Sequence, residues 1–197
     1  MIVFLGLIGL LVWRHQVNTD IPAATPAADP SSLPGLQTGP LPWPREINNL
    51  AARLSAIGLA SSPMEGSVMH IHQHLTVEVD GQNVAVPANA GINEAARMIS
   101  PLHTHDEQGI IHAESFKVQP FYLGQIFDVW GLKFTKDSIG GYVVGDGKML
   151  KVWISGREVE GDPRPIELKN YDVVVVRYGT AEQLAVPVPS TYDFKNL

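Results

Sequence analysis

Six of the seven histidines of this 197-residue chain fall into two short segments. They are His70, His72 and His74 in "VMHIHQHLTVEVDG" (68–81), and His103, His105 and His112 in "PLHTHDEQGIIHAES" (101–115). Neutral imidazole is a common ligand of transition metals, whereas protonated imidazoles held close together repel one another. The clustering therefore predicts a metal site; a pH-sensing or purely hydrogen-bonded polar cluster and chance are the alternatives.

The first segment has the alternation of a β-strand. In a strand over residues 70–79, side chains at every second position share a face, so the three histidines of this segment lie together. The opposite face carries the apolar residues Ile71, Leu75, Val77 and Val79. We therefore expect the histidines on the face away from the core, as a metal platform requires.

The second segment predicts a hairpin. If "DEQG" (106–109) is a four-residue turn, His103 lies directly opposite His112, and residues in such pairs share a face with Cβ atoms about 5 Å apart. His105 and Glu114 then join them, whereas a turn one residue longer or shorter would point His112 away. Glu114 is either a metal ligand, a partner that orients a ring nitrogen, or a surface charge.

The remaining acidic and sulfur-containing residues near the histidines have simpler interpretations. Asp106 and Glu107 are expected to serve the turn, and Glu65 flanks the first segment with Met64 and Met69. Methionine beside histidine would favour copper, although a core or loop role for each methionine is the simpler expectation.

The composition limits the ligand types and the partners that the chain can use. It has no cysteine, so thiolate ligands, disulfides and Fe–S clusters are excluded. Histidine and carboxylate ligands suit a transition-metal ion, Cu or Zn. The formal charge is −6 and the basic residues are scattered, which argues against nucleic acid as a partner.

The amino-terminal residues predict attachment to a membrane. Residues 1–13 are an uninterrupted apolar run, closed by Arg14 and His15. The run is short for a span of about 20 residues, and an uncleaved anchor is preferred over a cleaved signal segment or a buried helix. The predicted organisation is a membrane segment (1–14), a proline-rich linker (15–44), a histidine-rich metal-binding domain (45–180) and an irregular tail (181–197), with the domain on the extracytoplasmic side.

The domain is predicted to be α+β and mainly β. Helices are expected over 46–60 and 121–134, a hairpin over 74–87, a strand, glycine turn and strand over 150–163, and a buried strand over 171–179. This order resembles a β-grasp domain of the ubiquitin-like superfamily, with the histidine-bearing hairpin inserted. The Gly-Gly tail of the sulfur carriers in that superfamily is missing, because the chain continues past Gly179. A cupredoxin-like β-sandwich is the alternative fold.

The segments "HIHQHL", "PLHTHDEQGIIHAES" and "FYLGQIFDVWG", after an apolar segment and a proline-rich stretch, are similar to a group of uncharacterised membrane-anchored bacterial proteins with HxHxHL and LHTHDxxGxIHxE motifs. The similarity covers most of 43–179 and implies no particular activity. Three hypotheses follow from the residues themselves: a metal-binding protein for chaperoning, buffering or sensing; a metalloenzyme, either a hydrolase or hydratase with Glu114 as base or a copper redox enzyme; and an interaction module with a structural metal.

Overall fold

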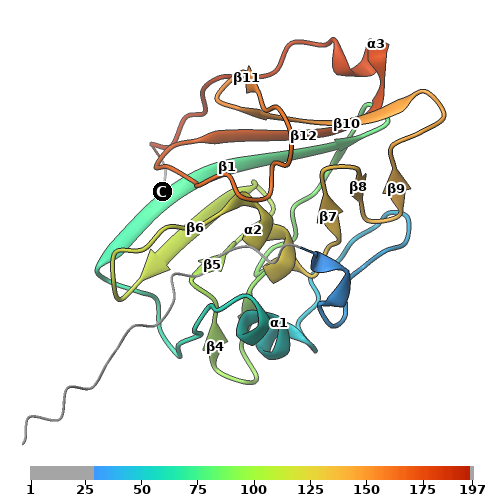
Figure 1. Cartoon of the computed structure of the whole chain (residues 1–197). Helices are drawn as coiled ribbons and strands as arrows, with labels where there is room; N and C mark the ends of the chain where they lie inside the picture. The colour runs from blue at the N-terminus through green and yellow to red at the C-terminus, as the bar shows by residue number, and fades with distance from the viewer. Residues whose placement is uncertain (1–28, 196–197) are drawn as a thin grey trace, which may run out of the picture.

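The computed structural model describes residues 29–195, and a seven-stranded sheet forms its centre (Figure 1). The strand order is β11-β10-β12-β1-β6-β5, and β2 also pairs with β1. The bounds of these strands are β1 Met69–Val79, β2 Gln82–Val84, β5 Leu102–His103, β6 Ile110–Ser115, β10 Lys148–Ile154, β11 Arg157–Glu158 and β12 Val173–Thr180. Smaller elements surround the sheet: η1 Pro30–Ser32, α1 Leu50–Ala56, α2 Leu123–Trp130, α3 Ala181–Leu184, the pair β3 Ile92–Asn93 and β4 Met98–Ile99, and the three-stranded sheet β7 Phe134–Thr135, β8 Ser138–Ile139 and β9 Tyr142–Val143. The α+β, mainly β class is confirmed.

Strand β1 is long enough to join two halves of the sheet. Its first half pairs antiparallel with β6, from Met69 opposite Ser115 to His74 opposite Ile110. Its second half pairs in parallel with β12, from His74 opposite Val173 to Val79 opposite Tyr178. The histidines therefore lie where β1 runs beside β6, whereas its apolar second half lies in the centre of the sheet.

One face of the sheet covers the main hydrophobic core. Leu75, Val77 and Val79 of β1 point into it and are buried, as their alternation predicts. Helix α2 supplies Phe127 and Trp130, and it ends at Gly131 in a left-handed conformation with a φ of 81°. Inside this core the carboxylate of Asp128 pairs with Arg164, with 2.8 Å between Oδ2 and Nη2.

The opposite face, here called the histidine face, carries the alternate residues of β1, from His70 to Glu78. At the β10 and β12 end of the sheet a second apolar cluster, Trp153, Val175 and Leu184, lies under α3 and the chain that follows it. The carboxyl-terminal chain reaches as far along β1 as His74, whose ring stacks on Tyr192 at a centroid distance of 3.9 Å.

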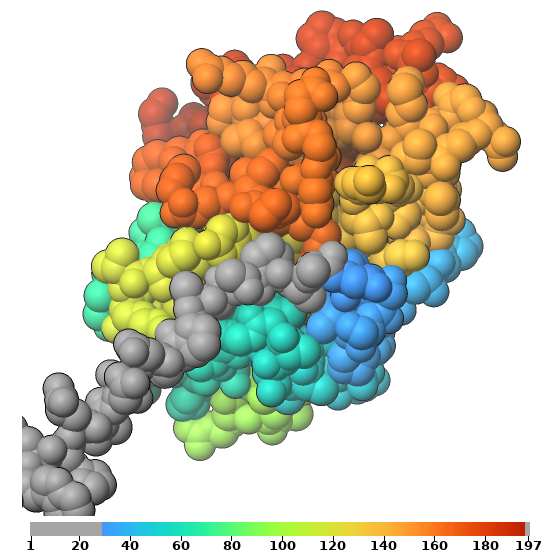
Figure 2. All heavy atoms as spheres, in the orientation of Figure 1, coloured from blue at the N-terminus to red at the C-terminus, as the bar shows by residue number. Residues whose placement is uncertain are grey.

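The linker prediction for 15–44 is wrong over its described part. Leu33 and Trp43 are buried in the core, and the backbone carbonyl of Trp43 accepts a hydrogen bond of 3.0 Å from the indole of Trp130. The backbone N–H of Gly141 also donates to Gly39, so this segment lies against the β7–β9 region (Figure 2). Proline-rich composition argued against packing, but the isolated apolar side chains in the segment have partners in the domain.

The predicted membrane segment, 1–14, lies outside the described residues. Within 29–195 no helix has the length and apolar character needed to cross a bilayer. The predicted helix over 46–60 is shorter than expected, since α1 comprises Leu50–Ala56 only, and the predicted irregular tail begins with the short helix α3.

Candidate metal centre

Strand pairing brings the histidines of three neighbouring strands together. In the β1–β6 ladder His72 lies opposite His112 and His70 opposite Glu114. In the β5–β6 ladder His103 lies opposite His112, as the turn length predicted. Because directly opposed residues share a face, His72, His112 and His103 form a row across the sheet. Strands are about 4.8 Å apart, and the ring centroids follow this spacing, at 4.7 Å for His72–His112 and 5.4 Å for His103–His112.

Four residues at one end of this row form what is here called the buried group. They are His103, His105, His112 and Glu114, and each offers a ligand atom within 4.8 Å of those of the others. The His105 ring is 4.5 Å from that of His112, although His105 lies in the turn after β5 rather than in the ladder. Ligand atoms of a tetrahedral zinc ion are about 3.4 Å apart, so closing on an ion requires only small side-chain movements.

His103 has the features expected of a metal ligand. Its side chain is fully buried, and its Nδ1 is 2.9 Å from the carbonyl oxygen of Ser100. The carbonyl only accepts, so Nδ1 carries the proton and Nε2 carries the lone pair. That Nε2 is buried and has no hydrogen-bond partner among the described residues. A carbonyl that holds one ring nitrogen while the other faces the ion is the usual arrangement around metal-bound histidine.

His112 and His103 are held in the neutral state that metal ligation requires, whereas burial disfavours the charged form of Glu114. Burial, together with the neighbouring histidines, lowers the pKa of His112 to about 3, so its imidazole is neutral at neutral pH. Burial likewise lowers the pKa of His103 to about 4. The carboxyl of Glu114 is 4% exposed, and burial raises its pKa. Its Oε1 lies 3.4 Å from Nδ1 of His112, and a bound cation would stabilise the carboxylate.

Glu65 is a site residue that sequence reasoning named only as a neighbour. Its Oε1 is 3.5 Å from Nε2 of His105 and 4.0 Å from Nε2 of His103. It lies between α1 and β1, where no strand or helix periodicity could place it. The adjacent Gly66 does carry a signal, because a Cβ there would be 2.3 Å from the backbone nitrogen of Ser115. Glycine thus lets this loop lie against β6, beside the histidines.

His70 and His72, here called the outer pair, form a second group with His112, again with ligand atoms within 4.8 Å. Their ring centroids are 4.5 Å apart, and burial and the His70 charge lower the pKa of His72. Nε2 of His70 is 3.0 Å from Oε1 of Glu114. His74 belongs to neither group; it lies opposite Ile110 in the β1–β6 ladder, and its ring is stacked on Tyr192. Six of the seven predicted site residues are therefore close together, and His74 lies apart.

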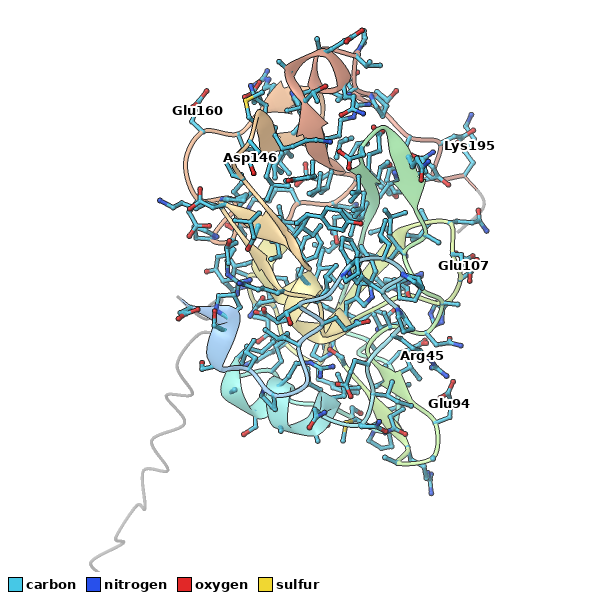
Figure 3. All side chains as sticks on the ribbon, turned by 90° about the vertical axis from the view of Figure 1, so that its right-hand side faces the viewer. Arg45, Glu94, Glu107, Asp146, Glu160 and Lys195 are labelled. Carbon is cyan, nitrogen blue, oxygen red and sulfur yellow. The ribbon has the colours of Figure 1, made fainter. Side chains whose placement is uncertain are left out.

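Of the two acidic turn residues, Asp106 supports the turn as expected. Asp106 accepts hydrogen bonds of 2.8 Å from the backbone nitrogen and the side-chain amide of Gln108. Glu107 points away from the domain at the molecular surface (Figure 3).

The centre adjoins cavities on two sides. A cavity of about 280 Å³ is lined by His103, Glu114 and Glu65, with apolar side chains such as Met64 and Phe116 at its rim. A smaller one, of about 100 Å³, is lined by His105 and His112 and by residues of the carboxyl-terminal chain. Small molecules therefore have room beside the candidate ligands.

Known proteins give no assignment for this arrangement. No protein-family model, no curated protein and no solved structure matches the chain.

Proposed function

We propose that this protein binds a divalent transition-metal ion, Zn²⁺ or Cu²⁺, through His103, His105, His112 and Glu114. The observation that carries the proposal is the buried Nε2 of His103, which has no hydrogen-bond partner within residues 29–195 while Ser100 holds the other ring nitrogen. An unpaired buried polar atom is costly, and a metal ion would remove that cost.

The donor set supports a divalent ion over Cu⁺. Three imidazoles and a carboxylate suit Zn²⁺ and Cu²⁺, whereas Cu⁺ prefers thiolate and thioether ligands. The chain has no cysteine. Met64 lines the larger cavity and is 62% exposed.

The same proposal includes the location of the domain and its fold. The apolar run of residues 1–13 supports a membrane tether with the domain on the extracytoplasmic side. There the protein would chaperone, buffer or sense the ion. The β-grasp assignment is likewise proposed, supported by the hairpin of β1 and β2, the parallel pairing of β1 with β12 and the antiparallel pairing of β12 with β10. The two-sheet sandwich has less support, since the sheets other than the central one have two and three short strands within 29–195.

A metalloenzyme is the second candidate, and the larger cavity favours it. Its walls include His103 and Glu114 from the proposed site, together with Glu65. A metal ion lowers the pKa of bound water, and a nearby carboxylate can act as the base for its attack on a substrate. The side chain of Glu65 is half-exposed beside His105, and its carboxylate could act as this base.

Metal analysis of the full chain, purified without an affinity tag, tests the primary proposal. The protein is loaded with Zn²⁺, desalted and analysed by mass spectrometry beside two variants. One carries His103→Asn, His105→Ala and His112→Ala; the matched control carries His74→Ala, because His74 is outside both groups. We expect at least one bound equivalent in the wild type and control, and at least one equivalent less in the triple variant. Equal zinc in all three proteins, or zinc in none, would refute the proposal.

A further inference from the structure

The outer pair of histidines is not needed by a single ion in the buried group. The two sets of candidate ligands within 4.8 Å of one another contain either His103 with His105 or His70 with His72, and among the described residues no such set contains histidines from both pairs. His112, at the middle of the row, belongs to both sets. One ion at either end therefore leaves the other pair of imidazoles without a role.

Glu114 lies between the two ends. The same atom, Oε1, is 3.0 Å from Nε2 of His70 and 3.4 Å from Nδ1 of His112. The residue is opposite His70 in the β1–β6 ladder, on the shared face of the sheet. It is therefore a candidate ligand of the buried group that also contacts His70 of the outer pair, although its side chain is nearly fully buried.

Ligand chemistry favours this carboxylate as the shared group. A neutral imidazole has one lone pair and can bind a second ion only after losing its remaining ring proton. A carboxylate has two oxygens and can bind one ion with each without any further loss of a proton. Sharing through Glu114 thus leaves His112 free to serve the buried ion alone.

From this geometry we infer that the protein holds two divalent transition-metal ions, one in the buried group and one on His70 and His72, with Glu114 bridging them. The inference rests on the proposed function, and it adds a second site and the shared ligand. Paired ions a few ångströms apart can bind one water or one substrate oxygen between them, which is the arrangement of two-metal hydrolytic sites.

The accessibility of the outer pair fits an exchangeable second ion. The side chain of His70 is half-exposed, whereas that of His103 is fully buried. The carboxyl-terminal chain contacts the histidine face at His74, through Tyr192, and lines the smaller cavity with His105 and His112, while half of the His70 side chain remains exposed. The second ion would therefore bind later and dissociate faster than the first.

Titration of the full chain with Zn²⁺, followed by native mass spectrometry, tests the inference. The wild type and the His74→Ala control should bind two equivalents, and a His70→Ala, His72→Ala variant should bind one. A His103→Asn, His105→Ala variant should also lose one equivalent. Circular dichroism of each variant checks that the sheet is retained.

Loading with Cu²⁺ supplies a readout that separate surface sites would not give. Two Cu²⁺ ions joined through Glu114 should show magnetic coupling in the electron paramagnetic resonance spectrum, and Glu114→Gln should abolish it. Zero equivalents in the wild type would overturn both this inference and the proposed function. A single equivalent in the wild type, unchanged in the His70→Ala, His72→Ala variant, would overturn the inference alone, as would two equivalents without coupling.

Discussion

The buried, neutral state of His103 makes a quantitative prediction about the metal-free protein. Its pKa is about 4 in the folded chain against an ordinary value of 6.5, because burial disfavours the imidazolium ion. As the pH falls below 6.5 the unfolded chain takes up this proton first, so the free energy of unfolding decreases until the pH reaches about 4. At pH 5 the unfolded histidine is nearly fully protonated and the folded one about one-tenth protonated. Integrating this difference from pH 8 to pH 5 gives a loss of about 2 kcal/mol.

The assay is urea unfolding of chelator-treated protein at several pH values, with wild type compared to His103→Asn. Asparagine keeps an N–H near the position of Nδ1, which donates to Ser100, and has no titration in this range. The comparison is needed because burial also raises the pKa of Glu114, which acts in the opposite direction: the folded carboxyl takes up its proton first. The wild type should lose about 2 kcal/mol more than the variant between pH 8 and pH 5. Parallel pH profiles for the two proteins would refute the argument that His103 is held neutral by burial.

Three further substitutions test the turn beside the site, the ion pair in the core and the stacking contact of the carboxyl-terminal chain. Gly109→Ala should lower the free energy of unfolding by about 1–3 kcal/mol in thermal unfolding, because Gly109 has a φ of +80° and its Cβ would lie 2.4 Å from a carbonyl oxygen of β1. Arg164→Met should cost about 3–5 kcal/mol in urea unfolding, because Asp128 loses its guanidinium partner in the core, and adding Asp128→Leu should restore most of this loss. Tyr192→Ala removes the stacking on His74 and should leave the zinc stoichiometry unchanged in native mass spectrometry.

Local sequence pattern was a good guide to individual strands and a poor guide to their partners. Alternation in β1 and the apolar run Val173–Val176 in β12 predicted strands that the structure contains. The parallel pairing of these two strands joins residues about a hundred positions apart, and no local pattern encodes it. The described part of the predicted linker failed for the same reason: the Trp43 ring packs edge-on against Tyr142, and its backbone carbonyl bonds to Trp130, and both partners lie far along the chain.

The same distinction applies to the candidate site: local pattern predicted some of its residues, and contacts between distant segments placed the others. His103 opposite His112 followed from the length of one turn, because a hairpin register depends only on residues near the turn. The position of Glu65 depends on a loop that approaches β6 from elsewhere in the chain, and the stacking of His74 depends on Tyr192 near the carboxyl terminus. Neither could be reached by counting along a strand.

The row of histidines across three strands depends on two independent registers. A shift of one residue between β1 and β6 would turn His72 to the other face, and a shift between β5 and β6 would do the same to His103. His112 lies opposite both residues because both ladders have the right register. Packing alone does not explain this coincidence, since neutral imidazoles side by side gain little from contact and repel when protonated. The proposed metal ions would explain it, because one candidate set takes its ligands from β6 and the β5 region and the other takes them from β1 and β6, with His112 in both.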